Sequence, residues 1–194
     1  MNKSAKPKIE KPVKITKALI DSVLRSKQWI LRRSDNGVSH HGFKWASIGC
    51  WTVAPDWNKK NECGGGLHGN GPSTAPDECN WSSGTLLEFC EIGAEHVSIG
   101  GPHGKIKTKR ARILLINELP EGLKKFVGSL DLQGCTGITS LPAGLKEVNG
   151  SLDLQGTGIT QLPEGLHVGG YLDLHGTKIK EIPKDLKVDG EVLR

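Results

Sequence analysis

The feature that most constrains the fold is an internal repeat in the last third of the chain. The sequence LPEGLKKFVGSLDLQGCTGITS at residues 119–140 recurs in altered form at 141–161 and at 162–181, and a shortened copy, IPKDLKVDGEVLR, occupies 182–194. The period is therefore 22, then 21, then 20 residues. A regular period of this length is typical of a solenoid, in which each copy forms one coil and the coils stack. The repeat predicts a solenoid over residues 118–194.

Each copy carries a short strand-like segment, SLDL or YLDL, in which apolar and polar residues alternate. Neighbouring side chains of a strand point to opposite sides, so both leucines face the core and the aspartate faces outward. Stacking at about 4.8 Å joins the leucines of successive coils into one apolar strip. Each buried Leu or Ile then contributes about 1.5–3 kcal/mol. Where the chain must turn sharply after the strand, the copies have Gly134, Gly156 and Gly176.

These copies resemble bacterial leucine-rich repeats of the LPX type, short repeats of about 20 residues known from secreted effectors. The similarity covers residues 119–194 and rests on the Leu-Pro pairs and the LDL segments. Such repeats usually carry Asn after the strand, whereas this chain has glycine near that place. The resemblance implies a binding scaffold rather than an active site.

A column of aspartates is expected on the outward side of the repeat strands. Asp131, Asp153 and Asp173 occupy equivalent positions, and His175 follows the third. Like charges about 5 Å apart repel by roughly 0.8 kcal/mol in water, and by several-fold more where solvent is excluded. Two interpretations are open. These four residues form a docking surface for a cationic partner, or they are a solvated face left by repeat duplication.

The fourth copy begins a strand at residues 191–194, which would leave backbone donors and acceptors unpaired at the edge of the solenoid. We therefore predict a homodimer formed through this edge.

The two parts of the chain differ in charge as well as in pattern. Residues 1–117 hold 18 Lys/Arg against 10 Asp/Glu, a net of +8, and the remainder holds 8 against 11, a net of −3, which together give +5. The predicted division is a flexible basic arm at 1–13, an α+β ligand-binding domain at 14–117 and the solenoid at 118–194. A basic first part favours an anionic partner such as a nucleotide, a nucleic acid or an acidic protein. The alternative is that much of this charge lies in a loose tail.

Composition also predicts the compartment. The chain has no run of 18 apolar residues that could span a membrane, and its first residues lack the apolar core of a signal peptide. Cysteines are few and odd in number, which favours free thiols in a reducing cytoplasm, here that of a bacterial host. They are Cys50, Cys63, Cys79, Cys90 and Cys135.

The first part of the chain predicts one helix and several strands. Apolar residues at helical spacing indicate an amphipathic helix over 15–26. Strands are expected at 29–33, 86–92 and 97–99. Residues 105–116 predict one long strand or a hairpin arm, with three lysines on one face and an apolar end that caps the solenoid. The predicted fold class is an α+β domain with a mostly antiparallel sheet, followed by a short leucine-rich-repeat-like β-solenoid.

A glycine run at residues 64–66 suggests a close approach of the backbone to another group. Gly64, Gly66 and Gly69 match G-x-G-x-x-G, but no apolar strand precedes them and the following Asn-Gly-Pro-Ser cannot start the helix of a dinucleotide site. The remaining interpretation is a glycine nest whose amides hold an anion.

Four motifs lie in the same part of the chain: GFKW at 42–45, APDW at 54–57, CGGGLH at 63–68, and the pair Lys105 and Lys107. With them, residues 42–116 resemble a domain of uncharacterised bacterial and phage proteins. That family has no activity to transfer. Its combination with the repeats implies an accessory phage protein.

The leading hypothesis is a non-catalytic protein that sequesters an anionic, nucleotide-like ligand, as a phage counter-defence protein would. Tryptophan would stack a base, glycine amides and lysines would hold phosphate, and histidine would donate a hydrogen bond. No cofactor and no metal are expected. The predicted ligand site consists of Trp45, Trp57, Gly64, Gly65, Gly66, His68, Lys105, Lys107 and Lys109.

Three alternatives stay open. The first is an inhibitor of a host protein that acts through the repeat face. The second is a nucleotide-modifying transferase with Cys63 as nucleophile, His68 as base and Asp56 as orienting group. The third is a zinc site, although the spacings fit no common zinc finger. Its available ligands are Cys63, Cys79, Cys90 and His68.

Overall fold

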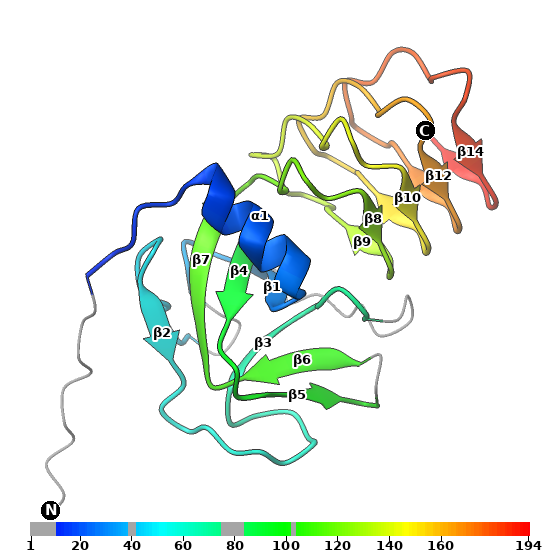
Figure 1. Cartoon of the computed structure of the whole chain (residues 1–194). Helices are drawn as coiled ribbons and strands as arrows, with labels where there is room; N and C mark the ends of the chain where they lie inside the picture. Colours follow the sequence, from blue (N-terminus) through cyan, green and yellow to red (C-terminus); the bar gives the residue numbers. More distant parts are fainter. Residues whose placement is uncertain (1–10, 39–41, 75–83, 102–103) are drawn as a thin grey trace, which may run out of the picture.

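The structure is a computed structural model that describes residues 11–38, 42–74, 84–101 and 104–194 (Figure 1). In the first three of these ranges and the start of the fourth, up to residue 116, it has one helix and seven strands. These are α1 (Lys17–Ser26), β1 (Trp29–Ser34), β2 (Trp51–Val53), β3 (Leu67–Gly69), β4 (Leu86–Ile92), β5 (His96–Ile99), β6 (Lys105–Thr108) and β7 (Arg110–Ile116).

Helix α1 begins and ends where the sequence supplies capping groups. The Oγ1 of Thr16 accepts a hydrogen bond from the backbone N–H of Leu19 at 3.2 Å, which satisfies one of the free donors of the first turn. At the other end Lys27 adopts a left-handed conformation, with φ of 57°, and its N–H bonds to the carbonyl of Leu24. The helix therefore starts two residues later than the apolar spacing alone predicted.

The first part contains two antiparallel sheets, which confirms the predicted α+β class. Sheet one has the strand order β1-β4-β7-β2, and sheet two has the order β3-β6-β5. The expected strand over 105–116 is divided at Lys109 into β6 and β7, which belong to different sheets. The division occurs because the backbone of Lys109 bonds outside both strands, to the carbonyl of Glu95 and to the N–H of Ala54.

Sheet one is covered on both faces. Trp29, Leu31 and Phe89 belong to the cluster that includes α1 and the solenoid, and Figure 1 shows α1 lying across β7, β4 and β1. Ile30 and Cys90, which alternate with them along the strands, belong to the opposite cluster. That second cluster is covered by the segment between β1 and β4.

Residues 118–194 form the predicted β-solenoid, with two short strands in each coil. The strands pair in parallel in two sheets of order β8-β10-β12-β14 and β9-β11-β13-β15. Only the second strand of each coil, the LDL segment, was predicted from the sequence. The strands are β8 (Lys125–Phe126), β9 (Leu130–Asp131), β10 (Glu147–Val148), β11 (Leu152–Asp153), β12 (His167–Val168), β13 (Leu172–Asp173), β14 (Lys187–Val188) and β15 (Val192–Leu193).

The turn after the LDL strand uses glycine in the first three coils and a threonine hydroxyl in the second and third. Gly134, Gly156 and Gly176 have φ of 71°, 68° and 67°, a left-handed conformation that glycine adopts without a steric penalty. Thr157 follows the second of these glycines, and its Oγ1 donates to the carbonyl of Leu154 at 2.8 Å. The sharp turn predicted at these glycines is thereby confirmed.

One apolar core runs from sheet one into the solenoid. The rings of Trp29 on β1 and Phe126 on β8 lie 6.4 Å apart, and both belong to a buried cluster that extends to Leu174. The side chain of Arg33 also joins the two parts. Its Nη2 donates to the backbone oxygen of Gln133 at 2.5 Å. In later coils the equivalent oxygen accepts from the glycine of the preceding coil. Sheet one therefore closes the first end of the solenoid.

Candidate functional site

Lys107 on β6, at the centre of the predicted ligand site, is fully buried. Its Nζ donates to Asn58 Oδ1 at 3.2 Å. It also donates to the backbone oxygens of Lys60, Glu62 and Gly64, at 2.5, 3.0 and 3.2 Å. An ammonium group has three N–H donors, so these four oxygens engage all of them. The lysine predicted to hold phosphate therefore orders the glycine loop of its own chain.

The glycines of this loop are needed for close packing around Lys107. Gly64 and Gly65 have φ of 90° and 63°. A Cβ on Gly65 would lie 1.8 Å from the Nδ2 of Asn58, and a Cβ on Gly66 would lie 2.6 Å from the Cγ of Lys107. The ring of Trp57 lies against Gly66 from another side. The loop therefore directs carbonyl oxygens toward a cation, and the proposal that its amides hold an anion stays a prediction.

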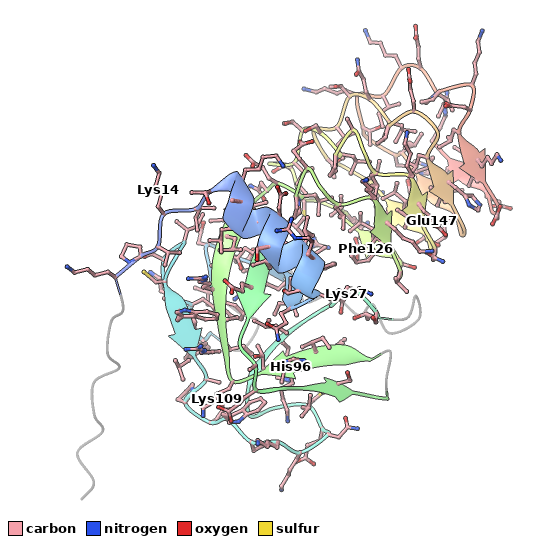
Figure 2. All side chains as sticks on the ribbon, in the orientation of Figure 1. Lys14, Lys27, His96, Lys109, Phe126 and Glu147 are labelled. Atoms are coloured by element: carbon pink, nitrogen blue, oxygen red, sulfur yellow. The ribbon has the colours of Figure 1, made fainter. Side chains whose placement is uncertain are left out.

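The structure does not bring the other predicted lysines and Trp45 to Lys107 in one open site. Lys109 Nζ lies 2.6 Å from Glu95 Oε1, as an exposed ion pair. Figure 2 shows Lys109 at the end of the N-terminal part that is remote from the solenoid. Lys105 is half-buried on β6. Trp45 is buried beneath sheet one, with the guanidinium carbon of Arg32 at 3.9 Å from its ring centroid.

His68 on β3 is opposite Lys107 in the sheet and has a buried, unpartnered Nε2 among the described residues. Burial lowers the pKa of His68, and the charges of Lys107 and Lys105 lower it further. This histidine is therefore neutral at neutral pH. Cys63 is exposed and does not hydrogen bond to Nε2, and the Cys-His-Asp arrangement of the transferase hypothesis stays a prediction.

Within the described residues no three histidine, cysteine or acidic side chains gather in a way that could hold a metal ion. Of the four residues named for a zinc site, Cys79 lies outside the described residues. Cys63 is exposed and Cys90 is buried within sheet one.

The repeat aspartates do form one column on the outward side of the β9-β11-β13-β15 sheet. Asp131, Asp153 and Asp173 pair directly in the parallel register. The Oδ1 of each accepts a hydrogen bond at 2.9 Å from the backbone N–H two residues later, at Gln133, Gln155 and His175. Each carboxylate therefore also stabilises its own turn. We call this surface the aspartate face; its outward residues are Asp131, Gln133, Asp153, Gln155, Tyr171, Asp173 and His175.

The side-chain partners of the three carboxylates differ along the column. Asp131 Oδ1 lies 3.4 Å from Nη1 of Arg33, and Asp173 Oδ1 lies 2.7 Å from Nδ1 of His175. Among the described residues no basic side chain forms an ion pair with Asp153, which lies between them. Burial raises the pKa of Asp153, the N–H of Gln155 lowers it, and the carboxylates of Asp131 and Asp173 raise it further.

Replacing Asp153 with asparagine is expected to stabilise the protein at pH 7 by about 0.5–1 kcal/mol, because like charges directly opposite one another in a sheet are destabilising. The amide oxygen keeps the bond from Gln155. The pKa of Asp153 is higher in the folded state than in the unfolded state, so ionisation of this carboxyl destabilises the fold. Below the unfolded pKa of about 3.9 the carboxyl is protonated in both states and this destabilisation is absent; it develops as pH rises through the folded pKa. Urea unfolding should therefore show a gain at pH 7 that disappears near pH 3.5.

The control for this variant is Asp173→Asn, which also removes a carboxylate. That carboxylate contacts His175, and the loss of the contact offsets the relief of repulsion. This control should give no such gain. A lower stability of Asp153→Asn at pH 7 would show that the column is not under repulsion.

A cleft of about 620 Å³ lies between the start of α1 and the first coil, and no sequence motif indicated it. Its apolar lining includes Ile20, Leu115 and Leu119, and Glu118 and Glu121 contribute acidic groups. The lining residues come from α1, from the end of β7 and from the repeats, which are distant in the sequence, so the cleft depends on tertiary packing.

The edge of the fourth coil is less buried than the inner coils. Val192 pairs with Leu172, which is fully buried, but is itself 44% exposed. Ile182 and Leu186 are also only partly buried. These residues are consistent with a contact surface, and the homodimer through this edge stays a prediction.

The helix of the described part, α1, has 10 residues, which is too short to cross a bilayer that requires about 20.

Comparisons of this chain with models of protein families, with curated proteins and with solved structures found no match.

Proposed function

We propose that this protein is a non-catalytic binding protein that holds a cationic segment of a partner protein on the aspartate face of its solenoid. The observation that carries the proposal is that the carboxylate of Asp153 lies between two other carboxylates and forms no ion pair among the described residues, although the more distant charge of Arg33 lowers its pKa. A cation placed there relieves repulsion that the fold itself leaves in place. Exposed Tyr171, which is 43% accessible, adds an amphipathic contact beside the column.

Arg33 supports a guanidinium as the preferred cation. Its side chain already lies on the first carboxylate of the column and also reaches the backbone oxygen of Gln133. Arginine is well suited to carboxylates because its planar group presents several donors. Asp153 and Asp173 repeat the position of Asp131 in the next two coils, so an arginine-rich segment lying along the sheet would find equivalent carboxylates.

The other sequence-based hypotheses stay proposals. Sequestration of a nucleotide-like anion in the first domain requires an available cation, and the structure gives Lys107 and Lys109 partners within the chain. The phage counter-defence role, the cytoplasmic location and the homodimer likewise rest on the sequence. The hypothesis of an inhibitor of a host protein agrees with the present proposal if that host protein supplies the cationic segment that binds the aspartate face.

The test uses fluorescein-labelled octa-arginine as the probe and fluorescence anisotropy as the measurement. Wild-type protein is expected to bind it in low salt, with an affinity that falls as salt rises, because exposed charges are screened. The double variant Asp153→Asn, Asp173→Asn should bind at least ten-fold more weakly. Any binding of labelled octa-glutamate should be the same for the wild type and the double variant.

The matched control removes two negative charges elsewhere on the solenoid, with Glu181→Gln and Asp185→Asn, both of which are exposed. It should keep most of the affinity for octa-arginine. Equal losses in the two double variants would mean that only net charge attracts the probe, and the aspartate face would not be its site.

A further inference from the structure

Arg32 on β1 is a buried guanidinium without an aligned acceptor among the described residues. The residue is 4% exposed, and its Nη1 and Nη2 are both buried and unpartnered. Its Nε lies 2.9 Å from Glu88 Oε2, a contact that pairs the charges without the alignment of a hydrogen bond. The other Glu88 oxygen accepts from Ser34 Oγ at 3.0 Å. Because an unsatisfied buried donor is costly, these N–H groups require an acceptor.

A second arginine of the same sheet shows the satisfied arrangement. Arg112 on β7 stacks over Trp51 at 4.7 Å, as Arg32 stacks over Trp45 at 3.9 Å. The Nε and Nη2 of Arg112 both lie 2.5 Å from Glu91 Oε2. Each arginine thus stacks on a tryptophan and lies beside a glutamate of β4, the neighbouring strand. They differ in that the Nη groups of Arg32 are left without a protein acceptor in the described part of the chain.

We infer that Arg32 and Trp45 form a binding site for an oxyanion group, a carboxylate or a phosphate, whose two oxygens accept hydrogen bonds from Nη1 and Nη2. The planar fork of arginine matches a pair of oxyanion oxygens, and such charge-assisted bidentate bonds are strong. The ring of Trp45 holds the guanidinium plane from one face. Burial excludes competing water, which strengthens the interaction.

Glu88 does not take the place of this group. Its Oε1 accepts from Ser34, and its Oε2 lies 2.9 Å from Nε but forms no hydrogen bond with Arg32. Its carboxylate lies opposite Arg32 in the register of β1 and β4. Burial raises the pKa of Glu88, while Arg32 and Ser34 lower it. Proton uptake by this carboxyl can therefore keep the cluster neutral when an anion binds. The site is independent of the aspartate face, because its residues lie on the opposite face of sheet one from the solenoid.

The experiment measures thermal unfolding of the whole chain in Tris chloride, with sodium formate or sodium phosphate added at constant ionic strength. The melting temperature is expected to rise with the logarithm of the anion concentration above Kd, by about 5–10 °C at one hundred times Kd. A response to formate alone indicates a carboxylate ligand, and a stronger response to phosphate indicates a phosphate ligand. Equilibrium dialysis of the labelled anion should give one site per chain.

Arg32→Lys keeps the charge and loses the fork, so it should lose most of the anion-dependent shift. Arg112→Lys is the matched control and should keep it. If neither anion raises the melting temperature more than chloride does, or if Arg32→Lys responds as the wild type does, the oxyanion site is excluded. Both variants retain a cation beside their glutamate, and circular dichroism verifies that each is folded before the comparison.

Discussion

Replacing Lys107 with methionine is expected to lower the free energy of unfolding by about 2–4 kcal/mol. Methionine preserves the length and volume of the side chain, so little packing is lost. The substitution removes the ammonium that now donates to Asn58 and to three backbone oxygens. Those oxygens lose a charged donor and become partly unsatisfied. Urea unfolding of wild type and variant measures the difference.

Lys105→Met is the control, because this lysine lies on the same strand and is only half-buried. Its effect should stay within about 0.5 kcal/mol. Hydrogen exchange provides a second readout at the backbone N–H of Asn58, which bonds to the carbonyl of Gly65 at 3.0 Å. This amide should exchange faster in Lys107→Met. A variant as stable as the wild type would show that the loop holds its conformation without the buried cation.

Leu152→Ala is expected to cost about 2–5 kcal/mol. Leu152 is fully buried and lies between Leu130 and Leu172 in the ladder of parallel strands. Removing its side chain opens a cavity that the coils on both sides line. Neither coil can close the cavity without breaking the hydrogen bonds of its own strand, so the site collapses poorly. Chemical denaturation measures the loss.

Val192→Ala tests the same ladder position in the fourth coil. This valine is 44% exposed, so its truncation should cost less than about 1 kcal/mol.

The continuous core between sheet one and the solenoid adds a further expectation. Leu152→Ala should shift one cooperative transition of the whole chain. Two separate transitions, with only one of them shifted, would contradict the coupling of the two parts.

The candidate site was predicted less completely than the fold. Tryptophan, lysine and glycine of the predicted ligand site do lie together, at Trp57, Lys107 and Gly66, and their role in binding a ligand stays a prediction. The sequence could not show that Lys107 faces inward. Alternation along a strand tells which residues share a face of the sheet, but it does not tell which face other segments of the chain cover. Arg32 and Arg33 were missed for the same reason. They are adjacent on β1, yet one faces Trp45 and the other faces the solenoid.

The sequence by itself determined the solenoid. Its repeat places leucine, aspartate and glycine at nearly equal intervals of 22 and 20 residues, and coils of the same pattern can bury their leucines only by stacking in register. The aspartate column follows directly from that register. Local rules suffice here because each coil contacts only its neighbours.

Tertiary structure alone decided what covers each face of sheet one. The loop around Lys107, the pairing of Arg33 with the first coil and the unsatisfied guanidinium of Arg32 all depend on contacts between segments distant in the sequence. Such contacts have no period, and they depend on which buried polar groups find partners once the chain is packed. Of the two proposed binding sites, the aspartate face therefore follows from the repeat, whereas the site at Arg32 follows from long-range packing.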